Sequence, residues 1–288
     1  MSAAPSELSV VPELSVVVAW RDRSDIARAL RQNAATLNGC RAEVVIVNAG
    51  GDRDDLHSLV QDCGCRTLRL IEMPGLHTFN KSECLNVGCH VSRGVSLLML
   101  DADVIVDDTF VVPAMEAVKR GGCFVSLRQV IESNPDVRPE TWRKGSYIRE
   151  RVMTTEITCA DGKYASFEYR ESSDGRRSGP GIVVVRRQDF TAVQGFNAQF
   201  EGWGYEDFDL QVRLQLALGL KRLTFGEAAH LSHPLAPSYA HTSARNLALG
   251  GDNYNRSELR GTLSADVVRW GRRIIEAPAL GRMRVTLP

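Results

Sequence analysis

The first 100 residues alternate short apolar runs with longer amphipathic stretches, and this order constrains the fold more than any other feature. Apolar, β-branched runs are typical of strands buried on both faces of a sheet. A repeated strand–helix order predicts a mostly parallel sheet with helices on both faces, which is the Rossmann-like, doubly wound α/β class. The predicted strands are 14–19, 43–47, 67–71 and 95–100, and helices are predicted after Ser24, which can cap the first, at 55–60 and at 81–91.

The second half of the chain is less regular. Residues 122–129 and 182–185 are predicted strands, and the polar segment 130–179 predicts a long excursion that contains a hairpin. In residues 208–218, apolar side chains alternate with others, which is a strand period. The residue types and the stop at Gly219 favour a helix, and a helix is our prediction.

We divide the chain into a flexible leader (1–11), one domain (12–242) and a C-terminal helical extension (243–288) packed on that domain. The segment from 236 onward holds eight Arg and four Asp or Glu, so it is locally basic. Within it, Val267, Trp270 and Ile274 share one helical face. Our main interpretation is a packed amphipathic helix with solvated arginines. The alternative is contact with an acidic partner or a membrane.

Composition excludes several classes of protein. Lys plus Arg and Asp plus Glu both total 35, so the formal net charge is zero, whereas nucleic-acid binders usually carry a basic excess. No apolar run reaches the roughly 18 residues of a membrane span, and the N-terminus lacks a basic signal-peptide region. The seven cysteines have no metal or redox spacing, which indicates reduced thiols. We predict a cytoplasmic protein without a transmembrane segment; the alternative is a domain of a secretory-pathway protein.

Asp101-Ala102-Asp103 directly follows the apolar strand 95–100. Ligands of parallel sheets bind beyond the carboxyl ends of the strands, so we expect this segment to share a crevice with Trp20-Arg21 and Asn48-Ala49. Two carboxylates at this spacing can hold a divalent cation together with diphosphate oxygens. The alternative is a pair of turn- or helix-capping aspartates, which is how we interpret Asp107-Asp108.

The segment Gly202-Trp-Gly-Tyr-Glu-Asp-Phe-Asp209 joins a glycine-flanked tryptophan to an acidic cluster. The flat side chain of Trp203 is suited to covering a sugar. Crowded carboxylates repel one another, which can raise the pKa of one of them. Such a carboxylate could accept a proton from an attacking hydroxyl. The alternative is an acidic helix N-terminus favoured by the helix dipole, and both interpretations can hold together.

His230 and His233 form a third signal. Imidazole is a common transition-metal ligand, so the pair could complete a metal site with Asp103. The alternative is two packed or surface histidines.

Taken together, these motifs resemble the inverting GT-A glycosyltransferases of family 2, and in particular the β-1,4-galactosyltransferase family. The similar blocks occur in the family's order and extend from about residue 14 to residue 242. They are Val18-Ala-Trp-Arg-Asp-Arg23, Val47-Asn-Ala-Gly50, Phe79-Asn-Lys-Ser-Glu-Cys-Leu-Asn-Val-Gly88, Asp101-Ala-Asp103, Gly181 to Phe196 with Gly202 to Asp207, His230-x-x-His233 and Ala240-His-Thr242.

The resemblance implies a GT-A fold and transfer, with inversion, of a hexose or N-acetylhexosamine from a UDP-sugar to an acceptor hydroxyl. Asp207 would be the general base, and Glu206 would contact the sugar or the acceptor. Asp103, His233 and His230 would bind Mn²⁺ or Mg²⁺. The residues implied in binding the donor are Trp20, Arg21, Arg23, Asn48, Phe79, Lys81, Asp101, Ala102 and Trp203.

Two departures from the family pattern matter. Ala19 stands where the family has proline, and Ser178-Gly-Pro180 stands where galactosyl-specific members carry bulky aromatics. Smaller groups there would leave room for an N-acetyl substituent. The acceptor stays open between a glycan, a natural product and a peptide. The alternative functions are a non-catalytic nucleotide-sugar or glycan-binding module and a sugar nucleotidyltransferase, although Trp20–Ser24 lacks the glycines of a nucleotidyltransferase phosphate loop.

Overall fold

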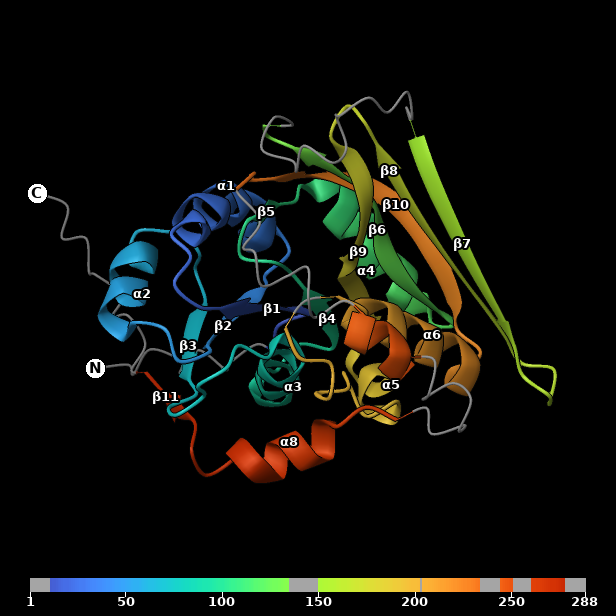
Figure 1. Cartoon of the computed structure of the whole chain (residues 1–288). Coiled ribbons are helices and arrows are strands. Elements are labelled where there is room, and N and C mark those ends of the chain that lie inside the picture. Colours follow the sequence, from blue (N-terminus) through green and yellow to red (C-terminus); the bar gives the residue numbers. More distant parts are fainter. Residues whose placement is uncertain (1–10, 135–149, 203, 234–243, 251–259, 278–288) are drawn as a thin grey trace, which may run out of the picture.

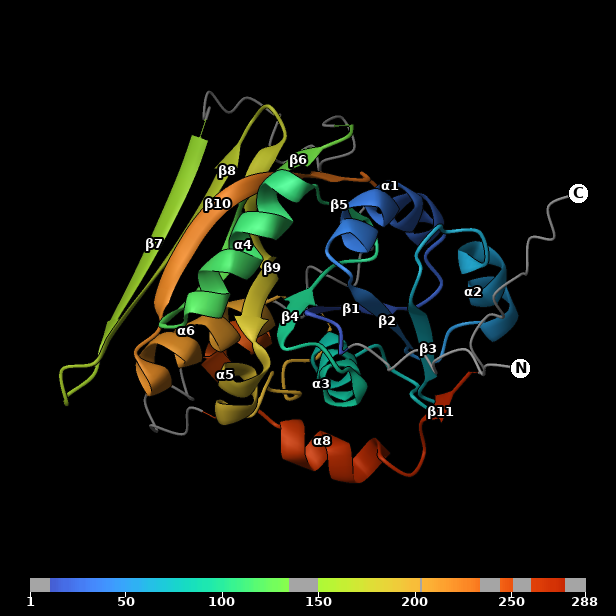
Figure 2. The same cartoon turned by 180° about the vertical axis from the view of Figure 1, so that it is seen from behind.

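The computed structural model describes residues 11–134, 150–202, 204–233, 244–250 and 260–277. They form a central mixed sheet with helices on both faces, which confirms the predicted α/β class (Figures 1 and 2). The sheet order is β11-β3-β2-β1-β4-β9-β6-β10-β5, with β7 and β8 joined to β9 at its side. The strands are β1 (Leu14–Trp20), β2 (Glu43–Asn48), β3 (Leu68–Glu72), β4 (Ser96–Met99), β5 (Val104–Ile105), β6 (Cys123–Glu132), β7 (Glu150–Thr158), β8 (Tyr164–Ser172), β9 (Arg176–Arg186), β10 (Lys221–His230) and β11 (Ile275–Glu276). The helices are α1 (Asp25–Gly39), α2 (Arg53–Val60), α3 (Lys81–Val91), α4 (Asp108–Arg120), α5 (Arg187–Ala192), α6 (Glu206–Leu218) and α8 (Leu263–Trp270).

The N-terminal half forms the parallel part of the sheet, as predicted. Strand β1 pairs in parallel with β2 and β4, and β2 pairs in parallel with β3. One local prediction is wrong: within the described chain, the Ser24 side chain makes no capping hydrogen bond, and its backbone is already helical. The Asp107 prediction is confirmed, because its carboxylate accepts hydrogen bonds from the Thr109 and Phe110 amides at the start of α4.

The C-terminal half makes the sheet mixed. Strand β9 is antiparallel to both β4 and β6, whereas β10 is parallel to β6. The predicted excursion contains the hairpin of β7 and β8, which extends along one side of the molecule (Figure 1). The predicted helix at 208–218 is confirmed as α6, which ends at Gly219 in the left-handed conformation.

Side chains alternate between two buried layers, one on each face of the sheet. Val16 and Val18 of β1 pack with α1, α2 and α4, and Val17 between them packs with α3, α5, α6 and α8. A period of two along each strand produces this division. It explains why the first strand is apolar at nearly every position.

The last described elements are joined to the first half of the chain. Helix α8 packs on α3, where Trp270 Nε1 donates a 2.5 Å hydrogen bond to the buried Glu83 carboxylate. Strand β11 pairs antiparallel with β3. Within the predicted extension, α8 therefore contacts α3 and β11 pairs with β3, while the proposed division of the chain into a leader, a domain and an extension stays a prediction.

All seven cysteines are free, and four are buried. Among the helices described, none combines the length and the apolar character that crossing a membrane requires. The cytoplasmic location stays a prediction.

Candidate active site and metal centre

The pairing of β5 with β10 builds one end of the site. His230, the last residue of β10, stands opposite Val104, and the Leu231 amide donates a 2.8 Å hydrogen bond to the Asp103 carbonyl oxygen. Since Asp103 directly precedes β5, this register brings the Asp103 carboxylate beside both histidines. The two motifs are more than 120 residues apart in the sequence but adjacent in space.

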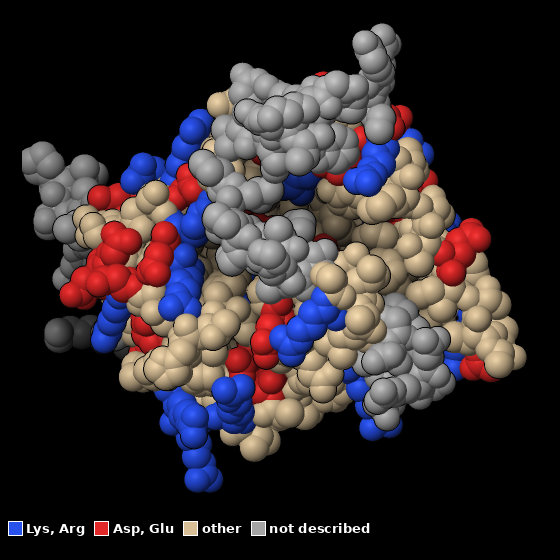
Figure 3. All heavy atoms as spheres, viewed as in Figure 1, with Lys and Arg blue, Asp and Glu red and all other residues tan. Residues whose placement is uncertain are grey.

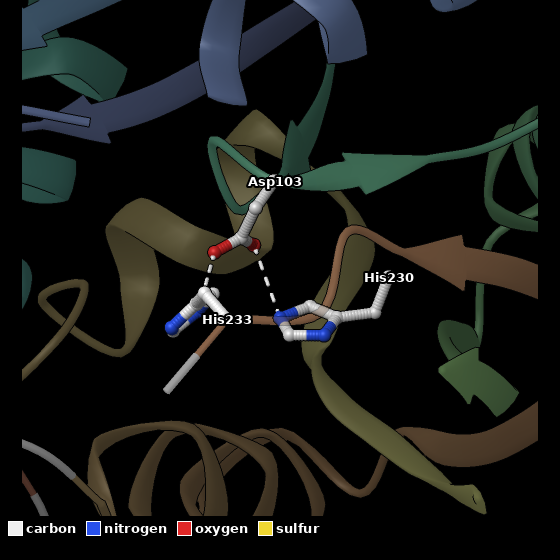
Figure 4. A group of neighbouring side chains, drawn as sticks. All are labelled: Asp103, His230 and His233. Carbon is white, nitrogen blue, oxygen red and sulfur yellow. Dashed lines mark ion pairs between the residues drawn. The ribbon is translucent and has the colours of Figure 1, made fainter. Parts of the chain in front are cut away.

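Asp103, His230 and His233 form a candidate metal centre. His230 Nε2 lies 3.5 Å from Asp103 Oδ1, and His233 Nε2 lies 3.2 Å from Asp103 Oδ2. Figure 4 shows the carboxylate beside the two imidazole rings. One ligand atom from each residue lies within 4.8 Å of the others, so a single cation could contact all three. One carboxylate and two imidazoles suit a divalent transition metal such as Mn²⁺.

Glu132, at the end of β6, orients His230 from behind. Its Oε2 lies 2.7 Å from His230 Nδ1, which directs Nε2 toward Asp103. The Glu132 side chain is only 7% exposed and also accepts hydrogen bonds from Ser232 and Arg177. A carboxylate behind a ligating histidine fixes the ring and raises its basicity. Sequence analysis missed Glu132, which could have been found only from the β6–β10 register that pairs it with His230.

The electrostatics of this centre favour charged side chains. Burial raises the pKa of Asp103, but hydrogen bonds from both histidines and the nearby Arg23 guanidinium hold that pKa well below its usual range. Burial lowers the pKa of His230, but the bonds to Asp103 and Glu132 outweigh burial and raise its pKa to about 9. A metal ion would replace the proton on His230, so binding should release protons.

A second cluster gathers Lys81, Asp101, Glu206 and Asp207 around Gly181. Lys81 Nζ lies 2.6 Å from Asp101 Oδ1 and 3.5 Å from Glu206 Oε1. A Cβ atom placed on Gly181 would lie 3.4 Å from Lys81 Nζ, 3.5 Å from Asp101 Oδ2 and 3.8 Å from Asp207 Oδ2. The missing side chain at Gly181 therefore leaves space where three charged groups converge.

The start of α6 supplies the two acids of this cluster. Tyr205 precedes the helix in the left-handed conformation, at φ 75°, and Glu206 is its first residue. Asp209, the third acid of the motif, points elsewhere and forms a fully buried ion pair with Arg213. The motif therefore begins a helix, and it places Asp207 beside the Gly181 space and Glu206 beside Lys81. A role of these carboxyl groups in accepting a proton stays a prediction.

Burial dominates the titration of these acids. Burial raises the pKa of Glu206, the negative charge of Asp207 raises it further, and the positive charge of Lys81 lowers it. The resulting pKa of Glu206 is about 7. Burial also raises the pKa of Asp207, against the opposing charge of Lys81. For Lys81, burial lowers the pKa, but Asp101 and Glu206 outweigh it and keep the ammonium charged. Carboxyl groups with raised pKa values are stronger bases once ionised.

The loop after β1 lies beside the metal centre. Arg23 Nη2 is 3.1 Å from Asp103 Oδ2, and Arg21 Nη1 donates to the His77 carbonyl oxygen. Trp20 is fully buried, and its indole donates to the Arg23 carbonyl oxygen, so it supports the loop from below. Asn48 is also fully buried. Its side-chain amide donates to the Gly51 carbonyl oxygen and accepts from the Gly51 amide, which stabilises the turn after β2. Direct contact of these residues with a donor stays a prediction.

The other predicted donor residues lie around the same edge. Phe79 and Ala102 are partly buried against the apolar core, and Trp203 lies outside the described residues. Asn80, missed by sequence analysis, links the two sides: it accepts from the Glu83 amide at the start of α3 and donates to the Ala198 carbonyl oxygen. The start of α3, which carries Lys81, is thus tied to the segment that precedes α6.

Residues 163–234 match a family model described as the N-terminal domain of galactosyltransferase. The match contains the acidic motif and both histidines, and the fold around it is GT-A. The chain has the GT-A fold. No curated protein sequence matches this chain.

Two solved structures resemble this chain in fold. A crystal structure of GalNAc-T7 with UDP, GalNAc and Mn²⁺ aligns with TM-score 0.56 and 13% identity over 85% of this chain and 48% of that one. A crystal structure of a mycobacterial protein aligns with TM-score 0.53 and 19% identity over 82% of this chain and 73% of that one. This chain spans about half the length of the GalNAc-T7 chain.

Proposed function

We propose that the protein transfers a hexose or N-acetylhexosamine from a UDP-sugar to an acceptor hydroxyl, with inversion and with Mn²⁺ or Mg²⁺ bound by Asp103, His230 and His233. The observation that carries this proposal is the division of Asp101 and Asp103 between two adjacent clusters. One cluster has the ligand set for a cation, and the other has carboxyl groups around an open space. The fold similarity to a protein solved with UDP, GalNAc and Mn²⁺ supports the donor class.

In this mechanism the acceptor oxygen attacks the anomeric carbon as the bond from that carbon to the diphosphate oxygen breaks. Asp207 takes the proton of the attacking hydroxyl. Lys81 offsets the charge of Asp101 and Glu206 and so keeps the acids ordered around the reacting centre. Arg23, beside Asp103, is placed to offset charge on the leaving group. The cation, when bound, supplies further stabilisation of the diphosphate charge.

The proposed donor range includes N-acetylhexosamines because the β9 segment before the site is small. Ser178, Gly179 and Pro180 lead to Gly181, and none of these four residues carries a bulky aromatic side chain. An N-acetyl group needs more room than a hydroxyl. The donor could therefore be a simple hexose or its N-acetylamino derivative, and both belong in the first screen.

The test is a donor screen with UDP-Gal, UDP-Glc, UDP-GlcNAc, UDP-GalNAc and GDP- and TDP-sugars, each with and without Mn²⁺. We expect one UDP-sugar to raise the melting temperature only with metal and to release UDP slowly. Stabilisation without any UDP release would favour the non-catalytic binding module. If no nucleotide sugar raises the melting temperature or releases its nucleotide, with or without Mn²⁺, the proposal is overturned. Once an acceptor is found, NMR of the product tests inversion, because an α-linked donor must give a β-linked product.

A further inference from the structure

A groove of about 650 Å³ lies on the sheet face beneath the β7–β8 hairpin, and nothing in the proposed chemistry so far uses it. It is bounded by β6, β8, β9 and the start of β10. Its volume is within the range of pockets that hold small-molecule ligands. Figure 3 shows one face of the molecule, on which basic and acidic side chains are interspersed over the described surface.

Arg222, near the start of β10, is the unusual residue of this groove. Its guanidinium lies 4.6 Å from the centre of the Phe167 ring and donates a 3.1 Å hydrogen bond to Ser126 Oγ. Its Nε is buried and has no hydrogen-bond partner in the structure. A guanidinium carries five N–H donors, so most of its hydrogen-bonding capacity is unused here.

The other four arginines that line the groove are already paired with carboxylates. Arg222 differs from them because, within the described residues, no carboxylate lies within ion-pair distance of it. The four existing pairs are Arg128 with Glu227, Arg170 with Glu168, Arg176 with Asp174 and Arg177 with Glu132. An arginine held by an aromatic ring but lacking a counterion is a site for an external oxyanion.

Burial supports the same conclusion. It lowers the pKa of Arg222, and the more distant charges of Asp207 and Glu168 only partly offset that cost. The Glu168 carboxylate is engaged with Arg170 Nε at 2.6 Å. A ligand anion placed against Arg222 would supply the missing counter-charge.

Strand β9 runs from the groove to the reacting centre. Ser178 lines the groove, and Gly181, three residues further on the same strand, faces Lys81, Asp101 and Asp207. Three residues of a strand span about 10 Å, which is the length of one or two sugar units. A molecule in the groove could therefore place a hydroxyl at Asp207 while another of its groups reaches Arg222.

We propose that this groove binds the acceptor, and that Arg222 binds an oxyanion, a carboxylate or a phosphate, carried by that acceptor. That the ligand of the groove is an acceptor rests on the proposed glycosyl transfer. The anion site at Arg222 can be tested separately. It narrows the acceptor class from any hydroxyl compound to an acidic one.

The test compares three probes by isothermal titration in the presence of UDP and Mn²⁺, which fill the donor site. The probes are 4-nitrophenyl β-D-glucoside, the corresponding glucuronide and the corresponding glucoside 6-phosphate. We expect one acidic probe to bind at least about 10-fold more tightly than the neutral one, as for a charge-assisted hydrogen bond. Which acidic probe binds distinguishes a carboxylate from a phosphate.

Arg222→Gln should reduce that preference to less than about 2-fold, and Arg222→Lys should retain part of it. Arg128→Gln is the matched control, because Arg128 lines the same groove but is exposed and paired. Equal binding of all three probes to the wild-type protein, or an acidic preference that survives in Arg222→Gln, overturns the inference. Mn²⁺-dependent UDP binding, measured on each variant, verifies folding. Its absence from the wild-type protein would count against the proposed function and not against the anion site.

Discussion

Asp101 and Asp103 are two residues apart, yet they belong to two clusters with opposite electrostatics. Around Asp103, two histidines and Arg23 favour the ionised carboxylate. Around Gly181, where Asp101 lies, burial raises the pKa values of Glu206 and Asp207 toward the neutral range. The first environment suits a permanent ligand, and the second suits groups that gain and lose protons.

The difference arises from where each cluster obtains its partners. The residues of the candidate metal centre lie at the ends of β5, β6 and β10, and backbone pairing holds these strands together. The Gly181 cluster draws on the first residues of α3 and α6, whose side chains meet with Lys81 as their single described cation. Strand registers thus position the candidate metal ligands, and helix termini position the acids proposed to transfer protons. The following substitutions test that division.

The largest effect is expected from Asp103→Ala, which removes a ligand shared by both histidine contacts. Loss of an outer-shell partner alone typically costs 10–100-fold in metal affinity, so we expect Mn²⁺ affinity to fall by more than about 100-fold. Isothermal titration with Mn²⁺ and UDP measures this. The control is Asp161→Ala, at the exposed hairpin turn. Unchanged Mn²⁺ affinity would remove Asp103 from the metal centre.

Asp207→Asn should separate the two clusters most clearly. The amide cannot accept the acceptor proton, so we expect the transfer rate to fall at least about 100-fold while UDP and Mn²⁺ bind normally. Single-turnover kinetics with the identified donor give the rate. Asp108→Asn, in the first turn of α4, is the control. Near-normal turnover of Asp207→Asn would contradict its role as the base.

Glu132→Ala tests whether the support behind His230 belongs to the metal centre. We expect Mn²⁺ affinity to fall about 10–100-fold, because the imidazole loses its orienting carboxylate. Glu227→Ala, on the neighbouring strand and exposed, should have no such effect. Equal Mn²⁺ affinities of the two variants would show that Glu132 is only a structural partner of Arg177 and Ser232.

The smallest expected effect concerns stability against pH. The folded-state pKa of Glu206, about 7, lies above its ordinary value of 4.5, so the folded protein holds this proton more tightly. Its contribution to stability is complete below pH 4.5 and is lost as the pH rises through 7. Glu206→Gln should reduce the fall in unfolding free energy between pH 5 and pH 7.5 by about 2 kcal/mol, because most of the effect of raising the pKa from 4.5 to about 7 is expressed in this interval.

Denaturant unfolding in the presence of EDTA measures this slope, because chelation removes any contribution of metal binding. The control is Glu201→Gln, an exposed carboxyl five residues earlier that pairs with Arg245. If the wild-type protein and Glu206→Gln lose stability in parallel as the pH rises, the buried carboxyl at 206 is not the group that titrates.

The first half of the fold was predictable because β1, β2 and β4 are buried on both faces and are therefore apolar along most of their length. The mixed pairing in the second half was not, since the direction of β9 is set by contacts with β4 and β6 that leave no local pattern. Residues 208–218 show the same limit. Their apolar side chains alternate as in a strand. The helix α6 was predicted correctly only because the residue types and the stop at Gly219 both favour a helix.

The site was predictable where chemistry and position coincide. Asp103, His230 and His233 are ligand types at strand ends, and the structure brings them together. Glu132 was missed because an isolated glutamate at the end of a predicted strand carries no signal without its register. Trp20 and Asn48, which are predicted to bind the donor, are both buried beneath the loops, and their contact with a donor stays a prediction.

The docking of α8 and β11 has a practical consequence for preparing shorter fragments of this protein. Glu83 is 2% exposed, and its carboxylate is bonded by Trp270 and Arg269. The Ala277 amide, in turn, donates to Leu70 on β3. A fragment cut at residue 242, where the recognisable motifs end, would uncover a bare carboxylate and an open sheet edge. We expect such a fragment to aggregate, so the minimal expressible unit continues through Ala277.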